Sequence, residues 1–87
     1  MIKLEYSKNF LKSVQKLPHP IIKKLADLLV IFQENPFHST LHVKKLVGPL
    51  AGFYSFRITR DWRIIFQFLN SETIKLLRVG YRKDIYF

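Results

Sequence analysis

The sequence predicts an α+β fold in which an N-terminal strand and a helical hairpin precede a three-stranded antiparallel meander. Three observations predict it: an apolar/polar alternation at the N-terminus, two segments with helical periodicity, and three alternating apolar stretches joined by short turns. The chain has 87 residues, so we expect a single domain over residues 1–87. Its hydrophobic fraction of 48% is typical of a chain that packs a core.

The first half of the chain predicts one strand and two helices. Apolar and polar residues alternate over residues 2–6, which predicts the strand. A first helix is expected over residues 7–17, capped by Ser7 and ended by Pro18. A second helix is expected over residues 20–35, where apolar residues recur at i, i+4, i+7 and i+11. The two helices would form a hairpin with an apolar stripe that packs on the sheet.

The second half predicts a loop and then the meander. Residues 37–52 have no firm period, so they predict a loop with a short turn around residues 41–46. Strands are expected over about residues 53–59, 62–69 and 73–79. Because the connections between them are short, the strands should pair antiparallel.

Alternation along the first two meander strands predicts a two-faced sheet. Arg57 and Arg63 would emerge on the open face, while Arg60 would be a surface residue of the intervening turn. The third strand is ambiguous, because both of its alternating sets contain apolar residues. The following side chains would pack against the helices: Tyr54, Phe56, Ile58, Trp62, Ile64, Phe66 and Phe68.

The charge balance points to a polyanionic partner. Lys and Arg number 15 against 6 Asp and Glu, which gives a net charge of +9, and nucleic acid, a ribosome or an acidic protein would fit this charge. Arginines on strands suit the forked recognition of phosphate or carboxylate. All the arginines lie from position 57 onward: Arg57, Arg60, Arg63, Arg78 and Arg82.

Several classes of protein are disfavoured. The chain has no cysteine, which excludes disulfides and thiolate metal sites, and its three scattered histidines predict no metal site. No cofactor is predicted. No apolar run approaches the ~18 residues that span a membrane, and the N-terminus lacks a signal-peptide pattern, so we expect a cytoplasmic protein.

Three stretches in a fixed order resemble the RelE/ParE toxin superfamily of bacterial type II toxin–antitoxin modules. They are "KKLVGPLAGFYSFRI", "DWRIIFQF" and "LLRVGYRKDIYF". They match a leucine and a glycine before an Arg-containing strand, a second strand with an aromatic–Arg–hydrophobic start, and a terminal Val-Gly motif followed by Arg and Tyr. The resemblance covers the whole chain and is most distinctive from Lys44 onward. It implies a RelE-like, microbial-ribonuclease-type sheet with helices on one face, a toxin function and a cognate antitoxin as partner.

The resemblance is closer to the RelE-like mRNA interferase branch, whose members are endoribonucleases that cut messenger RNA in the ribosomal A site. ParE-like members instead poison DNA gyrase. Arg57, Arg63, Arg82 and Tyr86 match functional positions of the RelE-like toxins and are the catalytic candidates that the resemblance implies. Arg78 matches a position used in some relatives.

Cleavage of this class proceeds by attack of a 2′-hydroxyl on the adjacent phosphate, and leaves a 2′,3′-cyclic phosphate and a 5′-hydroxyl. It needs a proton acceptor, a proton donor and positive charge for the phosphorane. Arginine stays charged and suits the third role. We therefore expect Arg57 and Arg63 to bind phosphate and stabilise the transition state, and Arg82 to stabilise phosphate or protonate the leaving group.

The general base stays open. Ser55 stands where RelE has a lysine, and Tyr81 stands where many relatives have a histidine. The loop residues His38 and His42 are more typical of exposed bystanders. Tyr81 or Tyr86 could also stack on a base. Candidates for the base are Lys44, Lys45, Tyr81 and Tyr86, and candidates for substrate binding are Lys44, Lys45, Arg78 and Tyr81.

Other readings of the same residues remain. Arg57 and Arg63 could be surface residues that pair with solvent, Glu72 or Asp84, and Tyr86 could simply pack the C-terminus onto the sheet. The alternative functions are a ParE-like gyrase inhibitor and a catalytically inactive basic RNA-binding module.

Overall fold

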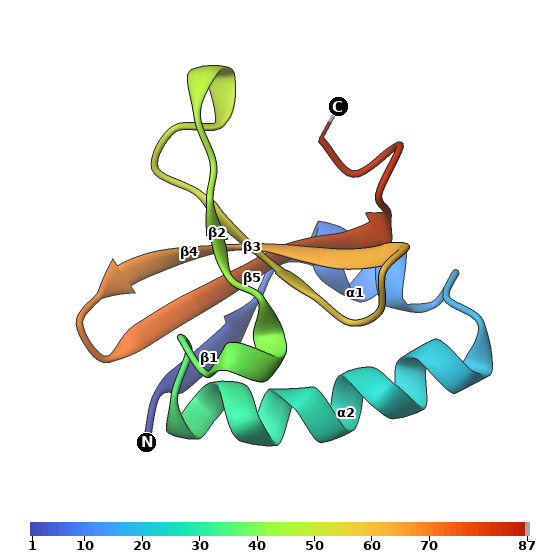
Figure 1. The fold of residues 1–87 in the computed structure, drawn as a ribbon, viewed down its shortest axis with the longest axis horizontal. Coiled ribbons are helices and arrows are strands. Elements are labelled where there is room, and N and C mark those ends of the chain that lie inside the picture. The colour runs from blue at the N-terminus through green and yellow to red at the C-terminus, as the bar shows by residue number, and fades with distance from the viewer. Residues whose placement is uncertain (87) are drawn as a thin grey trace.

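The computed structural model describes residues 1–86, which form a five-stranded mixed sheet and two α-helices (Figure 1). Phe87, part of the expected domain of residues 1–87, lies outside the described residues. Strand order is β1-β5-β4-β3-β2; β1 pairs parallel with β5 and all other neighbours are antiparallel. The α+β prediction is confirmed. The elements are β1 (Lys3–Tyr6), α1 (Lys8–Val14), α2 (His19–Glu34), the 3-10 helices η1 (Ser39–Leu41) and η2 (Gly48–Leu50), β2 (Lys44–Lys45), β3 (Tyr54–Arg57), β4 (Trp62–Asn70) and β5 (Thr73–Tyr81).

Helix α1 ends three residues before the predicted boundary. The predicted helix reached Leu17, but only Lys8–Val14 is α-helical, and the backbone N–H of Leu17 donates to the Val14 carbonyl in a tighter turn. The reason is that Pro18 disfavours helical geometry in the residue before it. Leu17 is still buried in the core, as the periodicity predicted.

The predicted loop contains a strand that its sequence did not reveal. Lys44 and Lys45 form β2 and pair with Ser55 and Tyr54 of β3. Two residues are too few to show a period of two, so the alternation test could not find this strand. Strand β3 is shorter than expected and ends at Arg57, whereas β5 is longer and continues to Tyr81.

Ser7 joins α1 to the sheet. Its side-chain oxygen accepts a hydrogen bond from the Phe10 N–H at 2.9 Å, which is the predicted N-cap. The same hydroxyl donates to the Leu77 carbonyl of β5 at 2.7 Å. Further along the helix, the Ser13 hydroxyl oxygen accepts from the Val79 N–H at 3.1 Å. The helix thus satisfies backbone groups of β5 beyond the end of its pairing with β1.

The main core lies between the helices and one face of the sheet, and α2 runs across that face (Figure 1). Phe32 of α2 is fully buried at its centre, with ring centroids 4.9 Å from both Phe56 and Phe66. The predicted helix-facing set is therefore correct, although Trp62 at the end of the sheet is only half-buried.

A second, smaller core lies on the opposite face. Leu46, Ile65 and Ile85 are buried together there, with Tyr86 packed beside them. Figure 1 shows the η2 segment and the C-terminal tail on the side of the sheet opposite α2. The face predicted to be open is thus partly covered, because the tail folds back over it.

A β-bulge resolves the ambiguity of the third meander strand. Ile65 pairs with Arg78, but its neighbour Phe66 pairs with Leu76, so Leu77 is an extra residue in β5. The inward-facing residues change from even to odd numbers at this point. Ile74, Leu76 and Val79 are therefore all buried in the main core.

None of the helices within residues 1–86 is long and apolar enough to cross a membrane.

Candidate functional site

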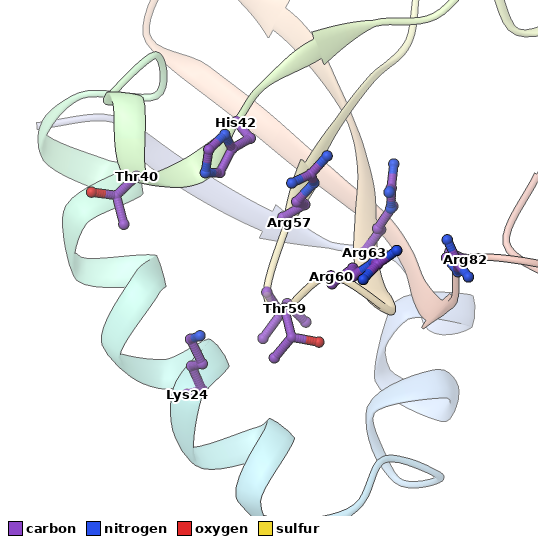
Figure 2. Close-up of a pocket in the computed structure, with 9 residues that line it drawn as sticks. Lys24, Thr40, His42, Arg57, Thr59, Arg60, Arg63 and Arg82 are labelled. Atoms are coloured by element: carbon purple, nitrogen blue, oxygen red, sulfur yellow. The ribbon is translucent and has the colours of Figure 1, made fainter.

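A cavity of about 500 Å³ lies where the sheet meets η1 and α2, and cationic side chains dominate its lining (Figure 2). Three of the predicted catalytic residues, Arg57, Arg63 and Arg82, line it together. Arg60, predicted to be a surface residue of the turn, is exposed but lines the same cavity. The full lining is Lys24, Thr40, His42, Arg57, Ile58, Thr59, Arg60, Arg63 and Arg82.

Strand order arranges these side chains in a row. His42 precedes β2, Arg57 ends β3, Arg63 lies in β4 and Arg82 follows β5, and these strands are neighbours in that order. Figure 2 shows His42 at one end of the row, Arg82 at the other and the remaining guanidinium groups between them. Residues far apart in the sequence are thus brought together at one end of four neighbouring strands.

Arg57 and Arg63 are direct cross-strand partners in the β3–β4 ladder. Directly opposed residues point to the same face, and like charges at such positions repel and destabilise the sheet. Within residues 1–86 neither arginine makes an ion pair with Glu72 or Asp84, which was the alternative reading of both. The Arg63 Nε is also buried without a hydrogen-bond partner. Such a pair is suited to an anion that would neutralise it.

Arg82 is held at its end of the row by Asp61. Its backbone N–H donates to the Asp61 carbonyl at 2.7 Å, and its Nε lies 3.4 Å from the Asp61 Oδ1. The Nε lacks hydrogen-bonding geometry, and the side chains are 39% and 44% exposed. Exposed ion pairs contribute little to stability. The backbone contact therefore positions Arg82, and its weak ion pair with Asp61 would compete little with a ligand for the guanidinium group.

A second cavity of about 290 Å³ adjoins the first, because Arg63 lines both. Lys44, Lys45 and Tyr86, three further predicted site residues, line this second cavity with Arg63. Leu46, Val47 and Leu50 complete it, so it combines apolar walls with positive charge. This composition suits a base or sugar attached to a phosphate in the first cavity.

Tyr86 packs the tail onto the sheet, which was one of its two readings. Its hydroxyl donates to the Ser55 Oγ at 3.4 Å, and its ring lies against the cluster of Leu46, Ile65 and Ile85. Because the ring also lines the second cavity, packing and ligand contact are compatible.

We expect Tyr86→Phe to leave the fold intact and to destabilise it by no more than about 1 kcal/mol, because it removes one long, partly buried hydrogen bond. Chemical denaturation would measure this. If the hydroxyl transfers a proton, the growth inhibition that the resemblance implies should fall sharply in the same variant; if the ring acts by packing or stacking, it should be retained. Tyr86→Ala, which removes the ring, is the comparison.

Two predicted site residues lie away from this row. Tyr81 pairs with Trp62 on the helix-facing side of the sheet, and the rings meet edge to face at 5.4 Å. Arg78 lines a third cavity, of about 390 Å³, with Lys12, Lys16 and Asp84.

The two loop histidines differ in position. The His38 Nδ1 accepts a hydrogen bond from the Thr40 N–H at 3.1 Å and so caps η1. His42 lines the arginine cavity. Sequence reasoning gave both the same low weight, and it also overlooked Lys24 of α2. The sequence carries no local pattern that places His42 or Lys24 in the cavity, because both side chains reach it through the tertiary arrangement of η1 and α2.

A family model matches residues 4–86 of the chain. It is described as the ParE toxin of the type II toxin–antitoxin system parDE. Comparison with curated proteins finds no relative of matching sequence.

Solved structures share the fold along nearly the whole chain. YafQ from E. coli is 21% identical, with a TM-score of 0.82 and coverage of 100% of each chain. In the RelB–RelE antitoxin–toxin complex from Methanococcus jannaschii the matching chain is 28% identical, with a TM-score of 0.76 and coverage of 94% of each chain. In the archaeal RelE–RelB complex from Pyrococcus horikoshii it is 24% identical, with a TM-score of 0.76 and coverage of 95% of this chain and 97% of that one. The architecture is therefore that of RelE-like toxins.

Proposed function

The chain belongs to the ParE toxin family, within the RelE/ParE superfamily of type II toxin–antitoxin modules, and from this premise we propose that it is a ribosome-dependent endoribonuclease that cleaves messenger RNA. The resemblance of the strand and tail motifs to the RelE-like branch supports this choice.

One observation carries the proposal: Arg57 and Arg63 oppose each other across two strands, in a row that ends at Arg82, and neither makes an ion pair within residues 1–86. A nuclease would use such a pair, because charge accumulates on the phosphoryl oxygens in the transition state and preorganised cations stabilise it there.

The roles follow from position. Arg57 and Arg63, on adjacent strands, would bind the non-bridging oxygens of the scissile phosphate. Arg82, at the end of the row, would stabilise the leaving 5′ oxygen. The nucleoside beside the phosphate would occupy the second cavity, next to Tyr86 and the two lysines of β2.

The partner that restrains the toxin would be a cognate antitoxin, as in the RelB–RelE complexes of the two archaeal relatives. A net charge of +9 suits a segment that presents acidic side chains to the basic face. Apolar side chains exposed beside it, such as Val47, would contribute binding that salt does not screen.

Gyrase inhibition is the second candidate, and the name of the matching family favours it. The two candidates differ in the macromolecule that is damaged, so one induction experiment separates them.

The test is induction of the toxin followed by primer extension on a translated message. Cuts in register with codons are the result expected of the nuclease. If cuts are absent and double-strand DNA breaks accumulate instead, the nuclease proposal is wrong and gyrase is the target. Induction of Arg63→Ala in parallel shows whether any cuts depend on the cavity.

A further inference from the structure

His42 is the one imidazole among the described side chains that line the arginine cavity, and imidazole is the side chain most often used as a general acid or base. The rest of the cavity's polar lining consists of lysine, arginine and threonine. The arginines suit charge stabilisation, and none of these groups is well matched to accept a proton at neutral pH. The cavity therefore holds one group with the chemistry that the row of arginines lacks.

The backbone of His42 is fixed in an unusual conformation. Its φ of 50° and ψ of 51° lie in the left-handed region, which only a few per cent of non-glycine residues adopt. It ends η1, where its N–H donates to the Ser39 carbonyl, and the preceding Leu41 is fully buried in the main core. The buried anchor and the sharp turn together set the direction in which the chain enters β2. They place the imidazole over the cavity even though the residue itself is exposed.

The position of His42 in the row fits an in-line reaction. In a displacement at phosphorus, the attacking and leaving oxygens lie on opposite sides of the phosphate. Figure 2 shows His42 and Arg82 at opposite ends of the row, with Arg57 and Arg63 between them. A phosphate held by the two central arginines would then have an imidazole on the side of attack and a guanidinium group on the side of departure.

We propose that His42 is the general base of this site, an assignment that rests on the proposed nuclease function. The His42 imidazole takes the proton of the 2′-hydroxyl as the O2′–P bond forms. The P–O5′ bond breaks, and the 5′ oxygen takes a proton from water beside Arg82. The resulting hydroxide is neutralised by the proton of the imidazolium, so the base is restored and the net change is transesterification to a 2′,3′-cyclic phosphate and a 5′-hydroxyl.

The test compares His42→Asn with His38→Asn, in stalled translation complexes and under single-turnover conditions. Asparagine is tolerated in the left-handed region, so the first variant keeps its backbone conformation. It can also replace the His38 Nδ1 as a cap acceptor, so the second variant keeps η1. The two changes are chemically identical, and only the first removes a group from the cavity. His42→Gly, which relieves any backbone strain, is a second variant without the imidazole.

We expect the cleavage rate of both His42 variants to fall by a factor of about 10² to 10⁴. The concentration that gives half of the maximal rate should stay unchanged, and His38→Asn should cleave like the wild type. Free imidazole added to the His42→Gly protein should restore part of the rate, which a merely structural residue would not allow. If the wild type cleaves the message and either His42 variant cleaves it at the same rate, the assignment of His42 is wrong while the proposed function stands. A wild-type protein that cuts no message overturns the proposed function and this assignment with it.

Discussion

The Arg63→Ala variant should lose growth inhibition while folding at least as well as the wild type. Removing this guanidinium group takes away charge stabilisation worth about 10² to 10³ in the cleavage rate. It also removes the repulsion with Arg57 across the β3–β4 ladder and a buried Nε that has no partner. Cross-strand pairs are worth up to about 1 kcal/mol, so the free energy of unfolding should stay level or rise by that amount.

Growth after induction measures toxicity, and chemical denaturation of the purified variant measures the free energy of unfolding. The matched control is Lys23→Ala, which removes one positive charge from an exposed position of α2 outside the cavity and should leave toxicity unchanged. A clear loss of stability in Arg63→Ala would contradict us, because it would make the arginine a structural residue whose toxicity phenotype follows from unfolding.

The purified protein should cleave a message held in a stalled translation complex faster than the same message free in solution, by several orders of magnitude. The arginine cavity supplies charge, but its described lining contains no Phe, Tyr or Trp on which a base could stack, and Tyr86 is the one aromatic residue in the described lining of the adjoining cavity. Arg57 and His42, at one end of the row, are exposed. Holding the reacting groups in line can be worth about 7 to 11 kcal/mol, and we expect the ribosome to contribute that part of the catalysis.

The measurement compares initial rates on the two substrates at equal toxin concentration. A message with a single 2′-deoxynucleotide at the cut position is the control, since it lacks the nucleophile and should resist cleavage in both settings. Similar rates on free and ribosome-bound message would show that the protein itself orients its substrate, and ribosome dependence would then be wrong.

Much of the fold was predictable because its longer elements carry strong periodic patterns. Helix α2 and strand β4 each have enough residues for the apolar repeat to be read, and both lie where the sequence predicts. Strand β2 was missed because two residues carry no period. Packing of the tail on the sheet was left as one of two readings of Tyr86, and the burial of Ile85 was not predicted, because a contact between the tail and the sheet is tertiary and leaves no mark on local alternation.

The candidate site was predictable in part for a similar reason. Alternation alone places Arg57 and Arg63 on one face, and antiparallel pairing brings them close. Tyr81 illustrates the limit: a motif comparison names it as a site residue, while its place opposite Trp62 depends on the register of β5. His42 illustrates another, because a loop residue gains its surroundings only from the elements that fold around it.

The β-bulge at Leu77 decides on which face of the sheet the last arginines lie. Without it, β5 would keep its even-numbered side chains toward the helices to its end, and the side chain at position 78 would turn into the core. With it, Arg78, Gly80 and the chain leading to Arg82 follow the face that carries Arg63. The bulge thus reverses which side chains face the helices in the last part of the chain. The hydroxyl of Ser7, seventy positions away in the sequence, donates a hydrogen bond to the carbonyl of Leu77 and so stabilises the bulge. Inserting one residue after position 77 would change no charge and no cavity residue, yet with a single bulge kept it would send the last arginine to the wrong side of the sheet.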